Sequence, residues 1–259
     1  YDPTGTTAHV VTDTTNETKT TYNVIAETAK GESSNVVMAG AHLDSVDGGA
    51  GINDNGSGTA GILAIAEALA KEKKLTNKVR FGFWGAEEAG LLGSQHWVYD
   101  QYDNNPAALE DIALYLNFDM IGSPNYVRFV YDGDNSMGGG VEGPEGSAQI
   151  EQLFTKYFSS VGLASEETEF SGRSDYGPFL EVGIPSGGLF TGAEGVKTEE
   201  QAAIYGGTAG DWYDPCYHQA CDDRDNVSAD GIDEMSDAAA HAVYTLAQST
   251  YAVNGEGKH

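Results

Sequence analysis

Two adjacent glutamates, Glu87 and Glu88, follow the apolar run at residues 81–84. Buried like charges repel each other strongly unless a cation or a proton lies between them. An acidic pair at the end of a strand is therefore expected to bind a metal ion or to act as a general base. We expect one role for each residue, with Glu88 as a metal ligand and Glu87 as the base.

Four further acids and histidines supply the rest of a metal centre. Zinc accepts histidine nitrogens and carboxylate oxygens, and two neighbouring ions need one bridging carboxylate and terminal ligands of their own. The residues that meet this requirement are His42, Asp54, Glu88, Asp119 and His218. With Asp54 as the bridge, one ion would bind His42 and Asp119. The other would bind Glu88 and His218, which leaves a shared position open for water.

Two other ligands fit this pattern less well. Calcium prefers oxygen ligands, so it would explain the acids but not His42 and His218. A phosphate would suit the five glycines of residues 47–58, but no lysine follows them as a P-loop requires. The remaining histidines are expected to be structural, and they are His9, His96, His241 and His259.

Three predicted strands end at candidate ligands. Residues 35–42 form a continuous apolar run that ends in His42, residues 78–84 lead to the glutamate pair, and the run at 111–121 carries Asp119 near its end. Helical patterns between these strands indicate a largely parallel sheet, in which the carboxyl ends of the strands meet at one edge. The helices expected there are residues 59–73 and 91–102. The candidate ligands are therefore expected to converge.

The whole chain, residues 1–259, is expected to form one α/β domain. A hairpin is predicted at the start, from strands at residues 8–13 and 21–28. Further strands are expected at 126–132, 166–170 and 184–190, and helices at 147–161 and 230–251. The segments 126–132, 147–161 and 166–170 look structural. The long excursion up to Asp211 is expected to line a substrate cleft.

Composition and cysteine content limit the partners. Forty acidic residues against thirteen basic ones give a net charge of −27, which argues against nucleic acids and anionic membranes. No apolar run approaches the length of a membrane span. Cys216 and Cys221 are too few for an all-cysteine zinc site and suggest a short disulfide loop, which favours an extracellular location. A reduced pair is equally compatible with the sequence.

Five strings resemble the motifs of the double-zinc aminopeptidases, closely those of the secreted leucine-type enzymes of streptomycetes. In chain order they are His42-Leu-Asp-Ser, Gly51-Ile-Asn-Asp-Asn-Gly-Ser-Gly, Trp84-Gly-Ala-Glu-Glu, Asn117-Phe-Asp-Met-Ile and Cys216-Tyr-His. The resemblance covers residues 22–247. It implies an α/β fold with a mixed, largely parallel central sheet flanked by helices on both faces.

The resemblance also implies an activity. The expected enzyme is secreted, binds two zinc ions and hydrolyses the N-terminal bond of peptides, preferring large hydrophobic N-terminal residues. A metal-bridged water would be the nucleophile, Glu87 the general base and Tyr217 the group that stabilises the tetrahedral intermediate. The residues implied near the substrate are Arg173, Phe190, Met120 and Tyr131. The peptide bond at Asp54–Asn55 is expected to be cis.

A calcium ion is a further implication. Asp233 and Asp237 are four residues apart on the predicted last helix and project from one face, although an exposed acidic face explains them too. Relatives complete this site with an N-terminal helical segment, which we expect to be absent from the present chain, so weak binding is expected. We expect a monomer, or a chain that associates with the missing segment.

Two other functions share the fold. A glutaminyl-cyclase-like acyltransferase would use one zinc ion, so the metal stoichiometry separates it from an aminopeptidase. A non-enzymatic, receptor-like module would have no reason to keep five ligands together with Glu87.

Overall fold

The computed structural model describes residues 5 and 7–255. A seven-stranded sheet with the order β1-β3-β2-β4-β7-β5-β6 forms its centre. The strands are β1 (Val24–Glu27), β2 (Glu32–His42), β3 (Asn77–Trp84), β4 (Ile112–Phe118), β5 (Phe129–Tyr131), β6 (Glu166–Thr168) and β7 (Ser186–Phe190). The four central strands β3, β2, β4 and β7 are parallel to one another, whereas β1 pairs antiparallel with β3. Strand β5 pairs antiparallel with β7 and parallel with β6. The predicted mixed, largely parallel sheet is confirmed.

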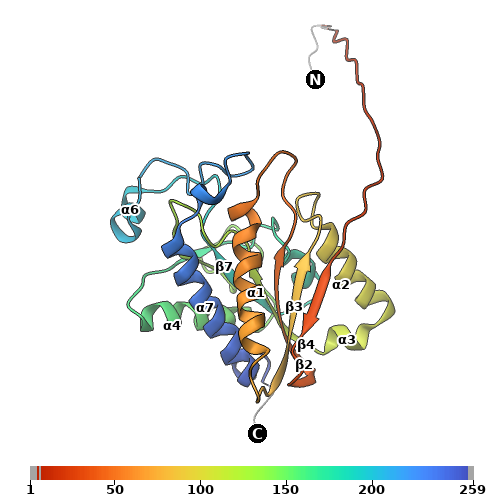
Figure 1. The fold of residues 1–259 in the computed structure, drawn as a ribbon, viewed down its shortest axis with the longest axis vertical. Helices are drawn as coiled ribbons and strands as arrows, with labels where there is room; N and C mark the ends of the chain where they lie inside the picture. The colour runs from red at the N-terminus through yellow and green to blue at the C-terminus, as the bar shows by residue number, and fades with distance from the viewer. Residues whose placement is uncertain (1–4, 6, 256–259) are drawn as a thin grey trace.

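Helices cover both faces of the sheet (Figure 1). One face packs against α1 (Gly58–Leu69), α4 (Ser147–Ser160) and α7 (Ala229–Gln248), and the other against α2 (Leu92–Asn104), α3 (Pro106–Glu110) and α5 (Gly177–Glu181). Side chains alternate between the faces along each strand, so Val37 and Ala39 of β2 point to the first layer and Met38 to the second. Both faces of β2 are therefore buried, as its continuous apolar run predicts.

Three of the remaining helices lie in connections, and they are η1 (Ile52–Ser57), α6 (Glu199–Tyr205) and η2 (Arg224–Asn226). The short helix α8 (Tyr251–Asn254) follows α7 and packs Val253 into the core. The predicted helix 230–251 stops at Gln248 because Thr250 is buried and accepts a hydrogen bond from Asn35 of β2 at 2.7 Å. No helix in the described part of the chain is both long and apolar enough to cross a membrane.

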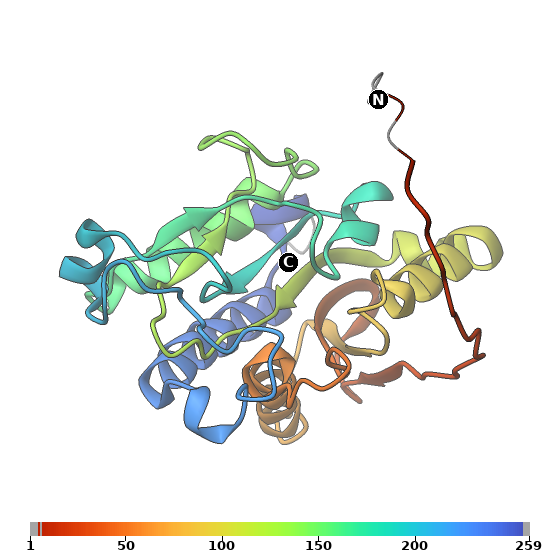
Figure 2. The same ribbon diagram turned by 90° about the horizontal axis from the view of Figure 1, so that it is seen from above.

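The predicted N-terminal hairpin is wrong. Residues 7–23 form neither strand nor helix. Figure 1 shows most of this segment extending away from the other elements, and Figure 2 shows it crossing in front of the helix α2. At its end, the Asn23 side chain forms hydrogen bonds with Gly85 and Gly93. Val10 and Val11 are 76% and 79% exposed, and neighbouring strand residues point to opposite faces, so this pair could not give a strand one apolar side. The chain joins the sheet only at β1, which pairs with β3.

Candidate metal centre

The carboxyl ends of three central strands carry the predicted ligands to one edge of the sheet. His42 is the last residue of β2, the glutamate pair follows β3 after a short turn, and Asp119 comes directly after β4. Asp54 lies in η1, where the peptide bond Asp54–Asn55 is cis as expected. His218 comes from the distant loop between α6 and η2.

The five predicted ligands come together in two groups that share Asp54. His42 Nε2 lies 3.1 Å from both Asp54 Oδ1 and Asp119 Oδ1. His218 Nε2 lies 3.2 Å from Asp54 Oδ2 and 3.0 Å from Glu88 Oε2. Asp54 thus directs one carboxylate oxygen toward each group, which is the arrangement that a bridging ligand requires.

The donor atoms fit zinc. Two ligand atoms about 2 Å from one tetrahedral zinc ion lie roughly 3.3 Å apart, close to the separations within each group. Nitrogen and oxygen donors together suit zinc better than calcium. Glu88 Oε1 is buried and has no hydrogen-bond partner within the described residues, so this oxygen is available to a cation.

The charges of the centre also call for a cation. Burial raises the pKa of Glu87 to about 9 and that of Glu88 to about 8, and neighbouring carboxylates add to both shifts. Burial alone would lower the pKa of His42, but Asp119 and Asp54 raise it well above its usual value. The cluster therefore holds protons near neutral pH that divalent cations can replace.

Asp44 holds the glutamate pair and was missed by the sequence reasoning. Its two carboxylate oxygens accept hydrogen bonds from the backbone N–H groups of Glu87 at 2.9 Å and Glu88 at 3.2 Å. Its carbonyl oxygen lies 3.0 Å from His42 Nδ1, which directs the other ring nitrogen into the centre. Only its position two residues after His42 could have indicated this role.

A chain of buried hydrogen bonds holds Asp119. Trp84 Nε1 donates to the Tyr115 hydroxyl at 2.9 Å, which donates to Asn117 Oδ1 at 3.0 Å. Asn117 Nδ2 donates to Ser174 Oγ at 2.8 Å, and that hydroxyl donates to Asp119 Oδ2 at 2.5 Å. Two strands and the segment before α5 thereby hold one ligand in place, and no motif in the sequence indicated this role for Ser174.

The loop that carries His218 also carries Tyr217, between the cysteines. Cys216 and Cys221 form the expected disulfide. The Tyr217 ring stacks on His218 with centroids 3.8 Å apart, and its hydroxyl accepts a hydrogen bond from Arg173 at 3.1 Å. Arg173 also pairs with Glu194 at 2.8 Å.

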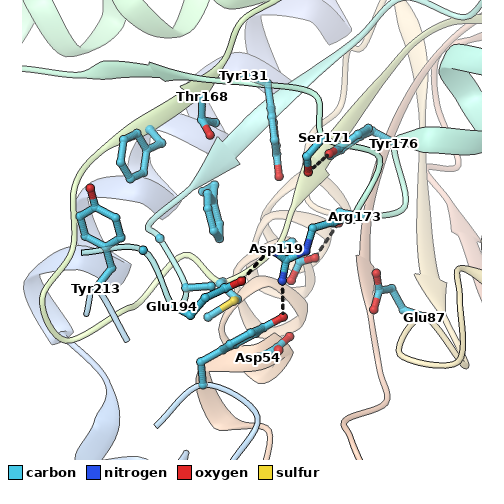
Figure 3. A pocket seen from close by; sticks show the side chains of 18 of the residues that line it. Asp54, Glu87, Asp119, Tyr131, Thr168, Ser171, Arg173, Tyr176, Glu194 and Tyr213 are labelled. Atoms are coloured by element: carbon cyan, nitrogen blue, oxygen red, sulfur yellow. Dashed lines mark hydrogen bonds and ion pairs between the residues drawn. The ribbon is translucent and has the colours of Figure 1, made fainter. Parts of the chain in front are cut away.

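A cavity of about 360 Å³ opens beside the centre. In Figure 3, Asp54, Asp119 and Glu87 lie at one end of it, and Tyr131, Thr168 and Tyr213 lie at the other. All four residues expected near the substrate line it, namely Arg173, Phe190, Met120 and Tyr131. Strands β5 and β6 also contribute Phe129 and Thr168 to the lining, so the view of these two segments as only structural is wrong.

Asp233 and Asp237 are exposed on α7 and belong to none of the groups of three close metal-binding side chains found among the described residues. The acids Asp132, Asp134 and Glu151 do form such a group, but it differs from the expected one. Calcium binding by the α7 pair stays a prediction.

The chain matches the model of a known peptidase family. The model of peptidase family M28 matches residues 23–243, so this chain belongs to peptidase family M28. It is 55% identical over 248 residues to the protein named Aminopeptidase of Pseudomonas aeruginosa strain UCBPP-PA14, covering 96% of this chain and 45% of that protein. It is 52% identical over 233 residues to Leucine aminopeptidase 2 of Arthroderma otae, covering 90% of this chain and 46% of that protein. The chain thus spans about half the length of the curated relatives it matches.

Solved structures of similar fold include a zinc aminopeptidase. BSAP, a zinc aminopeptidase from Bacillus subtilis, superposes with a TM-score of 0.67 at 26% identity, covering 90% of this chain and 52% of that chain. A glutaminyl cyclase from Porphyromonas gingivalis gives a TM-score of 0.64 at 18% identity, covering 86% of this chain and 77% of that one. At that identity the second likeness shows a common fold alone.

Proposed function

We propose that this chain carries the catalytic site of a secreted aminopeptidase that binds two zinc ions and removes the N-terminal residue of peptides. The observation that carries the proposal is the pair of ligand groups joined by Asp54, with the separate carboxylate of Glu87 beside them. His42 and Asp119 would hold one ion, and Glu88 and His218 the other.

The chemistry divides between the metal and the protein. Zinc, when bound, supplies a Lewis acid that polarises the scissile carbonyl and acidifies water. Glu87 belongs to neither ligand group, yet its Oε2 lies 4.0 Å from His42 Nε2. From this position Glu87 accepts the proton of the attacking water and passes it to the nitrogen of the leaving amine.

Tyr217 and Arg173, which line the same cavity, supply a hydrogen-bond donor for the reaction. The Arg173 guanidinium donates to the Tyr217 oxygen, so the phenolic proton stays free to donate elsewhere. Tyr217 donates it to the negative oxygen that develops during the reaction. Because the tyrosine lies beside the candidate ligand His218, the donor and the metal centre face the same atom.

The charge and the lining of the cavity define the substrate. Carboxylates of Glu87 and Asp119 at one end attract the ammonium group of a free peptide N-terminus. Apolar side chains that line the cavity accept a large hydrophobic side chain, and they are Met120, Phe129, Tyr131, Phe190 and Tyr213. The disulfide and the charge of −27 suit a monomer in an extracellular medium.

Hydrolysis of aminoacyl anilides tests the proposal. Leucyl p-nitroanilide should be cleaved, whereas its N-acetylated form, which lacks the ammonium group, should not. A chelator should abolish the activity, and two equivalents of zinc should restore it. Cleavage of the blocked substrate at an equal rate would refute the exopeptidase assignment, and full activity with one equivalent of zinc together with cyclisation of N-terminal glutamine would instead support the cyclase alternative.

A further inference from the structure

A buried polar cluster lies between the loop of Asp54 and the loop that carries His218. Its members are Asn53, Asp214, Asp222 and Asn226, which are between 0% and 7% exposed. None of them belongs to the two ligand groups. Two carboxylates buried this deeply need a compensating set of donors, and those donors come from both loops.

Asp222 binds the backbone of the residues around the shared ligand. Its Oδ1 accepts a hydrogen bond from the Asn53 N–H at 2.9 Å, and its Oδ2 accepts one from the Asp54 N–H at 3.0 Å. Its carbonyl oxygen accepts a third from the Ile52 N–H at 3.0 Å. Three successive N–H groups thus end on one residue, and the backbone of Asp54 cannot shift without breaking them.

Asp214 holds the other end of the loop that carries His218. Its carboxylate accepts hydrogen bonds from the Asn53 side chain at 2.7 Å and from the Cys216 N–H at 2.9 Å. The Asn226 amide donates to Asp214 at 2.8 Å and to Asp222 at 3.2 Å, so it joins the two carboxylates. Both ends of the disulfide loop are therefore tied to the residue before Asp54.

These contacts link Asp54, His218 and Asp222 to one another. Asp222 holds the backbone of Asp54, the Asp54 carboxylate lies 3.2 Å from His218, and His218 and Asp222 are four residues apart in one loop. By contrast, His42 and Asp119 lie at the ends of β2 and β4, where the sheet holds them. A change at Asp222 should therefore disturb the group that contains His218 more than the group held by the sheet.

We propose that Asp222 is a positioning residue that sets the place of Asp54 relative to His218 and thereby the zinc affinity of the group formed by Asp54, Glu88 and His218. The inference rests on the proposed function, because the two groups are proposed zinc sites. Partners of this kind, one bond removed from a metal ligand, typically change metal affinity by about 10–100-fold.

The test uses Asp222→Asn in the whole chain. The amide keeps the shape of the side chain but offers only one acceptor oxygen, so one of the two backbone N–H groups faces an NH₂ group. Zinc is titrated into the metal-free protein against a chromophoric chelator, and circular dichroism checks that the protein is folded. We expect one of the two equivalents to bind about 10–100-fold more weakly and the other to change much less.

Asp225→Asn is the matched control. Asp225 is exposed in η2, three residues after Asp222, and its replacement removes the same charge, so both equivalents should bind as in the unaltered chain. If Asp222→Asn does not fold, Asn226→Ala removes the link between the carboxylates without touching residues 52–54. It should weaken the same equivalent in the same direction, to a smaller extent.

Three outcomes would overturn the inference. Zinc binding by Asp222→Asn, or by Asn226→Ala in its place, that matches the control would remove the positioning role. Equal weakening of both equivalents with a lower melting temperature would reduce it to general stability. An unaltered chain that binds fewer than two zinc ions would instead refute the two-metal proposal itself, and with it the division between the groups.

Discussion

Replacing Glu87 by glutamine separates the base from its neighbouring ligand. Glu87 is 8% exposed in the wall of the cavity and belongs to neither ligand group, whereas Glu88 Oε2 lies 3.0 Å from His218. Glutamine keeps the shape of the side chain but cannot accept a proton. General acid–base catalysis usually contributes about 10²–10⁴-fold, so turnover should fall by that factor, a loss of about 2.7–5.4 kcal/mol in transition-state stabilisation.

The assay combines turnover with metal content. Turnover number is measured with leucyl p-nitroanilide at saturating substrate, and zinc by atomic absorption after dialysis. Glu87→Gln should retain both ions, whereas Glu88→Gln should lose one because a ligand oxygen is missing. Glu169→Gln removes a charge from the exposed rim of the same cavity and should keep most of the turnover. Equal metal content and equal losses of turnover in the Glu87 and Glu88 variants would refute the division of roles.

Four other outcomes are expected. The metal-free protein should become less stable as the pH rises from about 5 to about 8. Burial raises the pKa of Glu87 to about 9 and that of Glu88 to about 8, so the folded state retains protons that the unfolded chain has released. A melting temperature that rises over this pH range would contradict the prediction. Replacing Cys216 and Cys221 by serine should cost about 2 kcal/mol in the chain-entropy model, measured by denaturant unfolding, and no change would show that other contacts hold the loop. Phe190→Ala should lower kcat/KM about tenfold more for leucyl than for alanyl p-nitroanilide, because less apolar surface is buried, and an equal loss for both would remove it from the specificity pocket. Calcium should raise the melting temperature only slightly in calorimetry, since Asp233 and Asp237 are both exposed, and a large shift would mean that other ligands complete the site.

The sequence was most informative where candidate metal-binding side chains stand at the ends of strands. The runs that became β2, β3 and β4 carry His42, the glutamate pair and Asp119, and parallel strands bring their carboxyl ends to one edge. The order of the strands in the sheet was not predictable. Strand β7 inserts between β4 and β5, and the antiparallel pairing of β5 with β7 brings Phe129 beside Phe190 in the wall of the cavity.

The supporting residues could not be predicted for a different reason. Asp44, Ser174 and Asp222 form hydrogen bonds with Glu87, Asp119 and Asp54, which lie 43, 55 and 168 residues away in sequence. A single acid or serine in a loop carries no local pattern that separates this role from a solvated surface. The prediction of an N-terminal hairpin was wrong for the opposite reason, since a local pattern was present but no strand formed. Residues 8–13 have strand-like composition but no alternating apolar side to bury.

The two ligand groups differ in what holds them, and this difference comes from the topology. His42 and Asp119 are continuous with buried strands, so displacing them would disturb the core of the sheet. The side chain of His218 is 36% exposed and comes from a loop fixed by one disulfide and by hydrogen bonds to the loop of Asp54. Because Asp54 belongs to both groups, the rigid sheet fixes one side of the shared carboxylate and the loop fixes the other. A parallel sheet can supply strand-end ligands on its own, whereas this two-group centre also depends on the contact between the two loops.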